Sequence, residues 1–200
     1  MYALVFDFGG VLMKTVTRSF RWAWDDRLGL ARGTVERVVH GSESWRRAQV
    51  GVISVQDYWR DVAALLGLNS RELTELETDF FKGDQLDLEI VEFIRRCKLA
   101  GQRTALLSND SPALHDKLER LGISMLFDPL VISADIGVMK PDARAYQHVI
   151  GLLGCPPAQT VFVDDMPANI RGASDVGMNG ILYTPELDLE RTLSPYLGQV

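Results

Sequence analysis

Four short runs of apolar residues recur along the chain, and a polar residue stands close behind each of them. The runs cover residues 4–6, 105–107, 130–132 and 161–163. Short, continuous apolar runs are typical of strands that are buried on both faces, as in a parallel sheet with helices packed on both sides. We therefore expect four parallel strands in the core of the fold.

Segments with helical periodicity alternate with these runs from residue 83 onward. They cover residues 88–99, 112–121, 143–153 and 168–176, and a glycine lies at or near the end of each. Glycine is common just after a helix because it readily adopts the left-handed conformation. The alternation predicts an α/β fold, with a Rossmann-like parallel sheet as a core flanked by helices.

The stretch between the first strand and this alternating region has a different character. Residues 14–82 are rich in helix formers and hold all four tryptophans, Trp22, Trp24, Trp45 and Trp59. We expect a small helical cap inserted after strand one, so that residues 1–13 and 83–200 form the core domain and residues 14–82 the cap domain. Large aromatic side chains at helical spacing are most simply packing anchors.

Reactive side chains follow the predicted strands. Asp7 follows the first strand, Ser108 the second, the pair Asp164 and Asp165 the fourth, and Lys140 lies in the loop beyond the third. In open parallel sheets, ligands bind beyond the carboxyl ends of the strands. A carboxylate nucleophile, a hydroxyl, an amine and a carboxylate pair at that edge suit magnesium-assisted chemistry on a phosphate ester.

Composition narrows the classes of partner. The 200 residues are 46% hydrophobic, which is enough for one sizeable core, and the formal net charge is −6. An acidic chain without a long basic block argues against nucleic acid or an anionic membrane as the main partner. Two cysteines, no apolar stretch of membrane-spanning length and no basic leader at the start favour a cytoplasmic location.

Four segments, taken in order, resemble the motifs of the haloacid dehalogenase-like (HAD) hydrolase superfamily. They are residues 6–12, 107–110, 137–142 and 163–165, and the resemblance extends over nearly the whole chain. Within the superfamily the chain looks most similar to bacterial glucose-1-phosphate phosphatases and to the amino-terminal phosphatase domain of soluble epoxide hydrolase. Residues 43–54 also resemble the cap motif of that group.

This resemblance implies a magnesium-dependent phosphatase that acts on a small phosphorylated metabolite, with a sugar phosphate as one candidate. Asp7 would attack phosphorus and form a phospho-aspartyl intermediate, assisted by Ser108 and Lys140 as further catalytic residues. The Mg²⁺ ligands would be Asp7, the Gly9 carbonyl and Asp165, with Asp164 coordinating directly or holding metal-bound water.

The same resemblance implies a set of groups that bind the phosphate. Gly10 lets the backbone turn tightly behind Asp7, and the Ser108 hydroxyl and the Asn109 backbone N–H can donate to phosphoryl oxygens. The Lys140 ammonium would offset negative charge in the transition state. Each of these residues alone has an ordinary structural role, and it is their combination that predicts a phosphate site.

Position 9 departs from the superfamily pattern. Most phosphatases of this superfamily carry a second aspartate there, which serves as general acid and base, whereas this chain has Gly9. Loss of positioned proton transfer typically costs about 10²–10⁴-fold in rate. A good leaving group tolerates this loss, and Asp110 or Glu43 are carboxylates that could replace the missing acid.

Residues of the predicted cap are candidates for substrate recognition. Trp45, Arg46 and Arg47 lie in the cap motif, and Trp22 and Gln49 are further candidates. The sequence does not choose among them, and it does not indicate an oligomeric state.

Two other functions remain open. A 2-haloacid dehalogenase also lacks the second aspartate, but such enzymes have tyrosine at that position and work without magnesium, whereas this chain keeps Asp164 and Asp165. A non-catalytic protein that binds a phosphorylated metabolite is the second alternative, supported only by Gly9.

Overall fold

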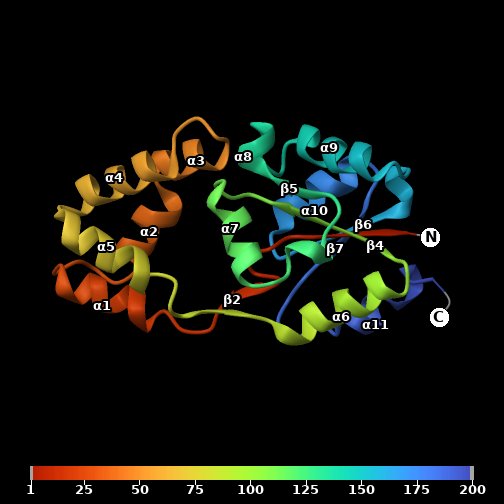
Figure 1. Ribbon diagram of the computed structural model, residues 1–200, viewed down its shortest axis with the longest axis horizontal. Coiled ribbons are helices and arrows are strands. Elements are labelled where there is room, and N and C mark those ends of the chain that lie inside the picture. Colours follow the sequence, from red (N-terminus) through yellow and green to blue (C-terminus); the bar gives the residue numbers. More distant parts are fainter. Residues whose placement is uncertain (1, 199–200) are drawn as a thin grey trace.

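A five-stranded parallel sheet forms the centre of the larger of two parts of the molecule, on the right in Figure 1. The computed structural model describes residues 2–198, and the strand order is β5-β4-β1-β6-β7. The strands are β1 (Ala3–Phe6), β4 (Arg103–Ser108), β5 (Leu130–Ile132), β6 (Thr160–Asp164) and β7 (Asn179–Leu182). Because β1 lies in the middle, its carboxyl end is flanked on both sides by the ends of β4 and β6.

Helices cover both faces of this sheet. Leu4 and Phe6 of β1 point to the face covered by α6 (Leu88–Leu99), α7 (Ala113–Arg120) and α11 (Leu189–Leu193). Ala3 and Val5 point to the opposite face, which is covered by α9 (Ala143–Leu153) and α10 (Pro167–Asp175). The alternation of side chains along a strand thus divides the apolar run into two buried layers.

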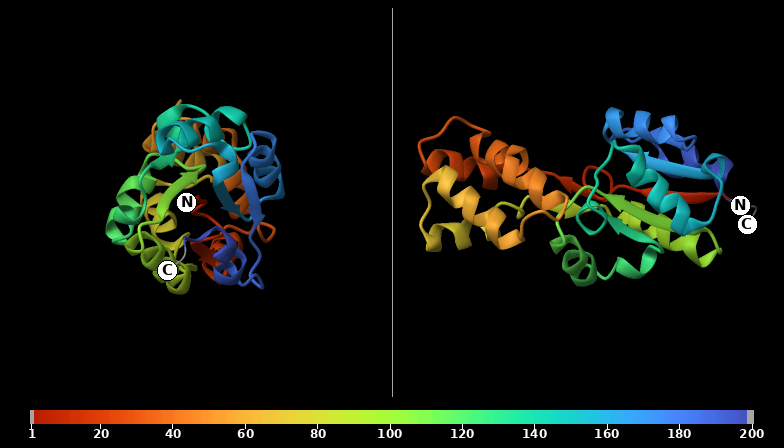
Figure 2. Two further views of the ribbon diagram at one scale, coloured as in Figure 1. Left: turned by 90° about the vertical axis from the view of Figure 1, so that its right-hand side faces the viewer. Right: turned by 90° about the horizontal axis from the view of Figure 1, so that it is seen from above.

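Five helices form a separate bundle beside the sheet (Figure 2). They are α1 (Ser19–Arg27), α2 (Thr34–Gly41), α3 (Glu43–Gln49), α4 (Val55–Leu66) and α5 (Ser70–Asp79). Trp24, Val39, Val62 and Phe80 are among the residues of its own apolar core. The helix starts are encoded locally, since Ser42 and Ser54 cap α3 and α4 and Asn69 begins α5 with a capping box.

Two contacts hold this cap against the core. The two segments that connect the core to the cap pair with each other as the antiparallel strands β2 (Met13–Thr15) and β3 (Asp84–Leu86). Beside them, the guanidinium group of the buried Arg21 lies 2.8 Å from the Asp84 carboxylate. On the other side, α3 lies beside the short helix α8 (Ser133–Ile136) (Figure 1). There the Ser133 hydroxyl donates to the Gln49 carbonyl oxygen at 2.5 Å. The cap is therefore fixed at both edges of the space between the two parts.

The structure confirms the α/β class and the helical cap after strand one. All four predicted strands and the four predicted core helices are present, with ends that differ by one or two residues. The fifth strand β7, the β2–β3 pair, α8 and α11 were not predicted, and three short 3₁₀ helices, Ser124–Leu126, Pro157–Gln159 and Ser194–Tyr196, complete the described elements. The domain boundaries at residues 13/14 and 82/83 stay a prediction.

None of the helices within residues 2–198 is both long and apolar enough to cross a membrane. The cytoplasmic location stays a prediction.

Candidate active site

The register of the central strands brings the predicted strand-end residues to one edge. Phe6 of β1 pairs with Leu106 of β4 and with Val163 of β6. One residue further on, the Asp7 backbone N–H donates to the Val163 carbonyl oxygen at 2.9 Å, so Asp7 lies level with Asp164. Ser108, buried at the end of β4, lies two positions beyond the residue that pairs with Phe6.

Lys140 lies between two of the carboxylates at this edge. Its Nζ is 2.9 Å from Oδ1 of Asp7 and 2.6 Å from Oδ2 of Asp164. The Lys140 side chain is 1% exposed, so these two carboxylates replace water around the ammonium. The Lys140 backbone is fixed by Asn109, whose amide group donates to the Lys140 carbonyl and accepts from its N–H, each at 2.8 Å.

The Asp164 carboxylate is held by several donors at once. Oδ1 accepts from the Met166 backbone N–H at 2.8 Å, and the Asn169 amide reaches both carboxylate oxygens at 3.0 Å. With Lys140 on Oδ2, Asp164 is fully buried and saturated with hydrogen bonds. Of the two roles expected of Asp164, direct coordination and holding metal-bound water, these hydrogen bonds favour the second, and they also fix Lys140 in place.

Three carboxylates form a cluster with the spacing of a cation site. Asp7, Asp164 and Asp165 each offer an oxygen, and these atoms lie within 4.8 Å of one another. Burial raises the pKa of Asp7 to about 6, against the lowering effect of Lys140, and Asp164 also raises it. Burial and the Asp164 carboxylate raise the pKa of Asp165 as well. A hard cation with oxygen ligands relieves this repulsion, so the donor set fits Mg²⁺.

Gly10 allows its backbone to lie very close to the Asp165 carboxylate. Its φ is +77°, in the left-handed region, and a Cβ placed on it would lie 2.1 Å from Oδ2 of Asp165. Any side chain at position 10 would therefore displace a member of the carboxylate cluster. The requirement for glycine here is both conformational and steric.

The space at Gly9 is open. A Cβ built on this residue meets nothing within 4 Å, so the backbone at position 9 does not itself require glycine. Of the two replacement acids considered from sequence, Glu43 is an exposed residue paired with Arg46 at 2.5 Å. Asp110 lies instead at the junction of core and cap, where burial raises its pKa to about 6.

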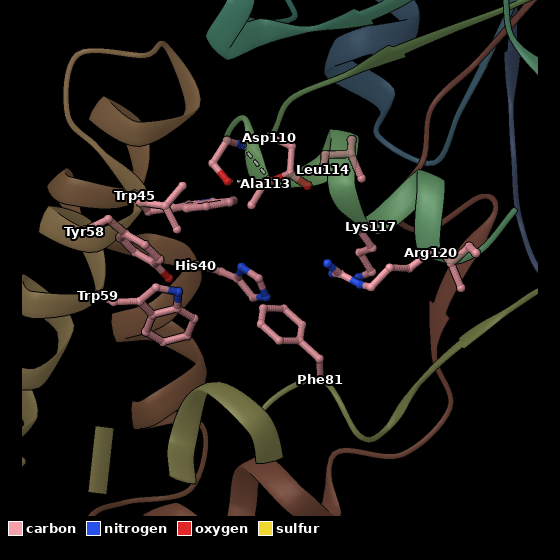
Figure 3. Close-up of a pocket in the computed structure, with 13 residues that line it drawn as sticks. His40, Trp45, Tyr58, Trp59, Phe81, Asp110, Ala113, Leu114, Lys117 and Arg120 are labelled. Atoms are coloured by element: carbon pink, nitrogen blue, oxygen red, sulfur yellow. Dashed lines mark hydrogen bonds between the residues drawn. The ribbon is translucent and has the colours of Figure 1, made fainter. Parts of the chain in front are cut away.

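A cavity of about 410 Å³ lies between the cap and α7 (Figure 3). Trp45, one of the predicted recognition residues, lines it. Arg46 and Arg47 are exposed on the same helix and are not among the lining residues, and neither is Trp22. The full lining consists of His40, Trp45, Val55, Tyr58, Trp59, Phe81, Asp110, Ser111, Ala113, Leu114, Lys117, Arg120 and Leu121.

Sequence reasoning missed Asn169 and the side-chain role of Asn109. Asn169 lies in the first turn of α10, where a polar side chain five residues beyond Asp164 can turn back to the strand end. Asn109 was considered only for its backbone N–H. A polar residue that follows directly after a predicted site residue is the signal that could have identified it.

Residues 1–177 match the model of the haloacid dehalogenase-like hydrolase family. The chain belongs to this family. The result confirms the resemblance noted in the four motifs, and it makes the protein a hydrolase of the HAD type.

Two curated relatives of this chain differ in how much of their own length it covers. A sesquiterpene phosphatase from Aspergillus oryzae is 30% identical over 92% of this chain and 91% of its own length. Drimenol cyclase from Aspergillus calidoustus is 24% identical over 98% of this chain but only 36% of its own length. The chain thus corresponds to a nearly complete phosphatase relative and to about a third of the cyclase.

A solved structure of a HAD family enzyme from Bacteroides thetaiotaomicron, in complex with magnesium and inorganic phosphate, has the same fold. The TM-score is 0.78, with 16% identity over 96% of this chain and 98% of the other. At this identity the likeness concerns the fold.

Proposed function

We propose that this HAD-like hydrolase is a magnesium-dependent phosphatase that acts on a small phosphorylated metabolite. The observation that carries the proposal is the cluster of Asp7, Asp164 and Asp165 with Lys140 between two of its members. The name of the sesquiterpene phosphatase agrees with phosphoric monoester hydrolysis, and one HAD structure of the same fold holds magnesium and phosphate.

Asp7 is the nucleophile in this proposal. A carboxylate oxygen of Asp7 attacks phosphorus, the bond from phosphorus to the ester oxygen breaks, and the leaving group departs as an alcohol after taking up a proton. Water then attacks the acyl phosphate at phosphorus, which releases inorganic phosphate and restores the Asp7 carboxylate. The first step consumes the Asp7 carboxylate and the second regenerates it, so the protein turns over.

Lys140 and a bound metal would both offset the negative charge of the phosphate group. The ammonium of Lys140 lies 2.9 Å from Asp7, close enough to reach phosphoryl oxygens that approach the same carboxylate. Bound Mg²⁺ would supply further positive charge, held by Asp7, Asp165 and the Gly9 carbonyl, with Asp164 as indirect support. Gly10, Ser108 and Asn109 complete the proposed phosphate site.

The absence of a carboxylate at Gly9 restricts the range of substrates. Without a positioned acid, the enzyme favours esters whose alcohol leaves readily, or it takes the proton from another group. A sugar 1-phosphate fits the first condition. The dehalogenase alternative is less favoured because the Asp164–Asp165 pair has no use in a metal-free reaction at carbon.

The test is phosphate release from a panel of sugar phosphates, nucleotides and p-nitrophenyl phosphate, with Mg²⁺ and with EDTA. Chloride release from 2-chloropropionate is measured in parallel. The proposal predicts Mg²⁺-dependent phosphate release that disappears in Asp7→Asn. Chloride release that does not depend on metal would assign the dehalogenase function instead. If neither phosphate nor chloride were released, the non-catalytic binding role would be favoured.

A further inference from the structure

Five aromatic side chains form a closed circuit at the cap face of the cavity described above. Neighbouring ring centroids are 5.1 Å apart for Trp45–Tyr58, 5.0 Å for Tyr58–Trp59 and 6.4 Å for Trp59–Phe81. His40 closes the circuit, at 6.4 Å from Phe81 and 5.8 Å from Trp45. We call these five residues the aromatic cluster; α7 faces it across the cavity (Figure 3).

The aromatic cluster is not simply part of the core of the cap. Tyr58 is a buried member of that core, and Trp45 and Trp59 pack against it while keeping part of their surface accessible. Phe81 is 38% exposed, His40 is exposed, and Trp45 and Trp59 are half-buried. Apolar surface left accessible in a concave site is a typical feature of a ligand pocket.

Polar groups in the aromatic cluster are few and mostly satisfied or neutral. The Tyr58 hydroxyl donates to the Val39 carbonyl oxygen at 2.9 Å, away from any ligand. Desolvation by the packed rings around it, and then the nearby Arg21, lower the pKa of His40 although part of the residue is accessible, so its ring is uncharged at neutral pH. A leaving group with several hydroxyls would exchange hydrogen bonds with water for contacts with carbon here, which is unfavourable.

The cavity adjoins the phosphate site through two connections. Helix α3 carries Trp45 and, four residues later, Gln49, whose amide donates to the Asn109 carbonyl oxygen at 2.9 Å. On the core side, Lys117 lines the cavity while its Nζ lies 5.4 Å from the ring of Phe8, the residue next to Asp7. The cavity and the Asp7 site are thus neighbours, and the proposal places the phosphate of one substrate at Asp7 and its organic part in the cavity.

From these observations we infer that the substrate is a phosphate monoester with an apolar organic part, such as a branched or linear hydrocarbon chain, which the aromatic cluster holds. The inference rests on the proposed phosphatase function and adds the substrate class to it. A volume of about 410 Å³ is within the range of pockets that bind small organic molecules. On its aromatic side the cavity thus suits an apolar organic part of medium size, while Asp110, Lys117 and Arg120 line the side that belongs to the core.

The test compares three esters of primary alcohols: octyl phosphate, butyl phosphate and glucose 6-phosphate. Their leaving groups have similar chemistry, so differences in kcat/KM report on the organic part. We expect octyl phosphate to exceed both others by at least about tenfold, since each buried methylene contributes favourably. Equal values, or a preference for the sugar ester, would overturn the inference while leaving the phosphatase function intact.

Two variants locate the effect in the cavity. Trp59→Ala should lower kcat/KM for octyl phosphate by at least about tenfold and that for butyl phosphate by less than about twofold. Ala113 is exposed on α7 and lines the cavity from the core side. Ala113→Trp should fill the cavity and should likewise lower kcat/KM for octyl phosphate much more than that for butyl phosphate. The control is Phe20→Ala, since Phe20 is an aromatic residue that is 39% exposed on α1 and outside the cavity, and it should change neither value.

A binding measurement separates this inference from the phosphatase proposal. If no ester is hydrolysed, octylphosphonate and butylphosphonate are titrated against the intact protein in Mg²⁺ by calorimetry. Tighter binding of octylphosphonate by at least about tenfold, lost in Trp59→Ala, would support the apolar pocket although the phosphatase function had failed. Equal binding of the two phosphonates would overturn the pocket assignment.

Discussion

The charged site at the sheet edge lies next to the cavity that the aromatic cluster lines, since Asp110 and Ser111 follow Ser108 and line that cavity. The two regions differ in how their side chains are held. Lys140 and Asp164 are buried and fixed by several hydrogen bonds each. Trp45, Trp59 and Phe81 keep accessible surface; the Trp45 ring packs against Tyr58, and the Trp59 ring meets Phe81 edge to face. Hydrogen bonds thus fix the charged groups of the first region in one geometry. The second region offers apolar surface, whose contacts do not depend on direction as hydrogen bonds do.

This difference separates reaction from recognition. Preorganised charges around phosphorus serve the same chemistry for any phosphate ester. An apolar surface discriminates among organic parts by size and desolvation. Variants of the first region should therefore affect all substrates alike, and variants of the second should affect them selectively.

Asp7→Asn should have the largest effect. It removes the nucleophile while keeping the shape of the side chain, so turnover should fall at least about 10⁴-fold for every substrate. Phosphate release measured with excess enzyme checks this. A residual activity close to that of the wild type would contradict the assignment of Asp7 and would remove the distinction between the two regions.

Gly10→Ala should have the next largest effect. Its Cβ would overlap the Asp165 carboxylate, and the positive φ adds strain, so we expect turnover to fall by about 10²–10³-fold for all substrates. Gly67→Ala is the matched control, because Gly67 has a φ of +69° but open space around it. If both variants lost activity equally, strain and not displacement of Asp165 would be the cause.

Gly9→Asp should increase activity where the leaving group is poor. The open space at Gly9 admits a carboxylate that can act as general acid, so we expect kcat for alkyl phosphates to rise about 10–10²-fold. The rate with p-nitrophenyl phosphate, whose phenolate leaves without help, should change little. Gly9→Asn, which has the same shape but donates no acidic proton, is the control; an equal gain in that variant would contradict the acid role.

Asp110→Asn should alter stability more than chemistry. Burial raises the pKa of Asp110 to about 6, so the folded state binds its proton more tightly than the unfolded state does, and ionisation costs stability as pH rises from about 4 to 6. The shift corresponds to about 3 kcal/mol at most, and partial solvent access reduces this to about 1–2 kcal/mol.

Urea unfolding at pH 8 and at pH 4 measures this effect. Asp110→Asn should be more stable than the wild type at pH 8, and the two proteins should be equal at pH 4. The same advantage at both pH values would show that the gain does not come from removing the ionised carboxylate.

The positions of the reacting groups could be predicted from sequence because they depend on local signals. An apolar run fixes β1 and β6, and the residue after each run falls at the same edge of the sheet, which places Asp7 beside Asp164. β7 escaped prediction because Asn179–Leu182 contains Gly180 and only two consecutive apolar residues. The short α8 likewise lacks a helical period.

The cavity could not be predicted because its walls come from distant parts of the chain. Trp45 and Trp59 are recognisable as large aromatic residues, but their alignment with Phe81 depends on how α5 packs against α4. Their position opposite Leu114 depends in turn on the contact of α3 with α8. The sequence-based candidates Arg46 and Arg47 show the same limit, since helix periodicity alone did not decide which face of α3 meets the core.

The most direct test of the central claim is to trap the acyl phosphate on Asp7. The protein is mixed with Mg²⁺ and its best phosphate ester, quenched, reduced with borohydride and digested, and the peptide that contains residue 7 is examined by mass spectrometry. Reduction of an acyl phosphate converts the aspartate to homoserine. The account predicts homoserine at position 7 when ester and Mg²⁺ are both present and aspartate when either is omitted. Steady phosphate release with Asp7 unmodified throughout would contradict it.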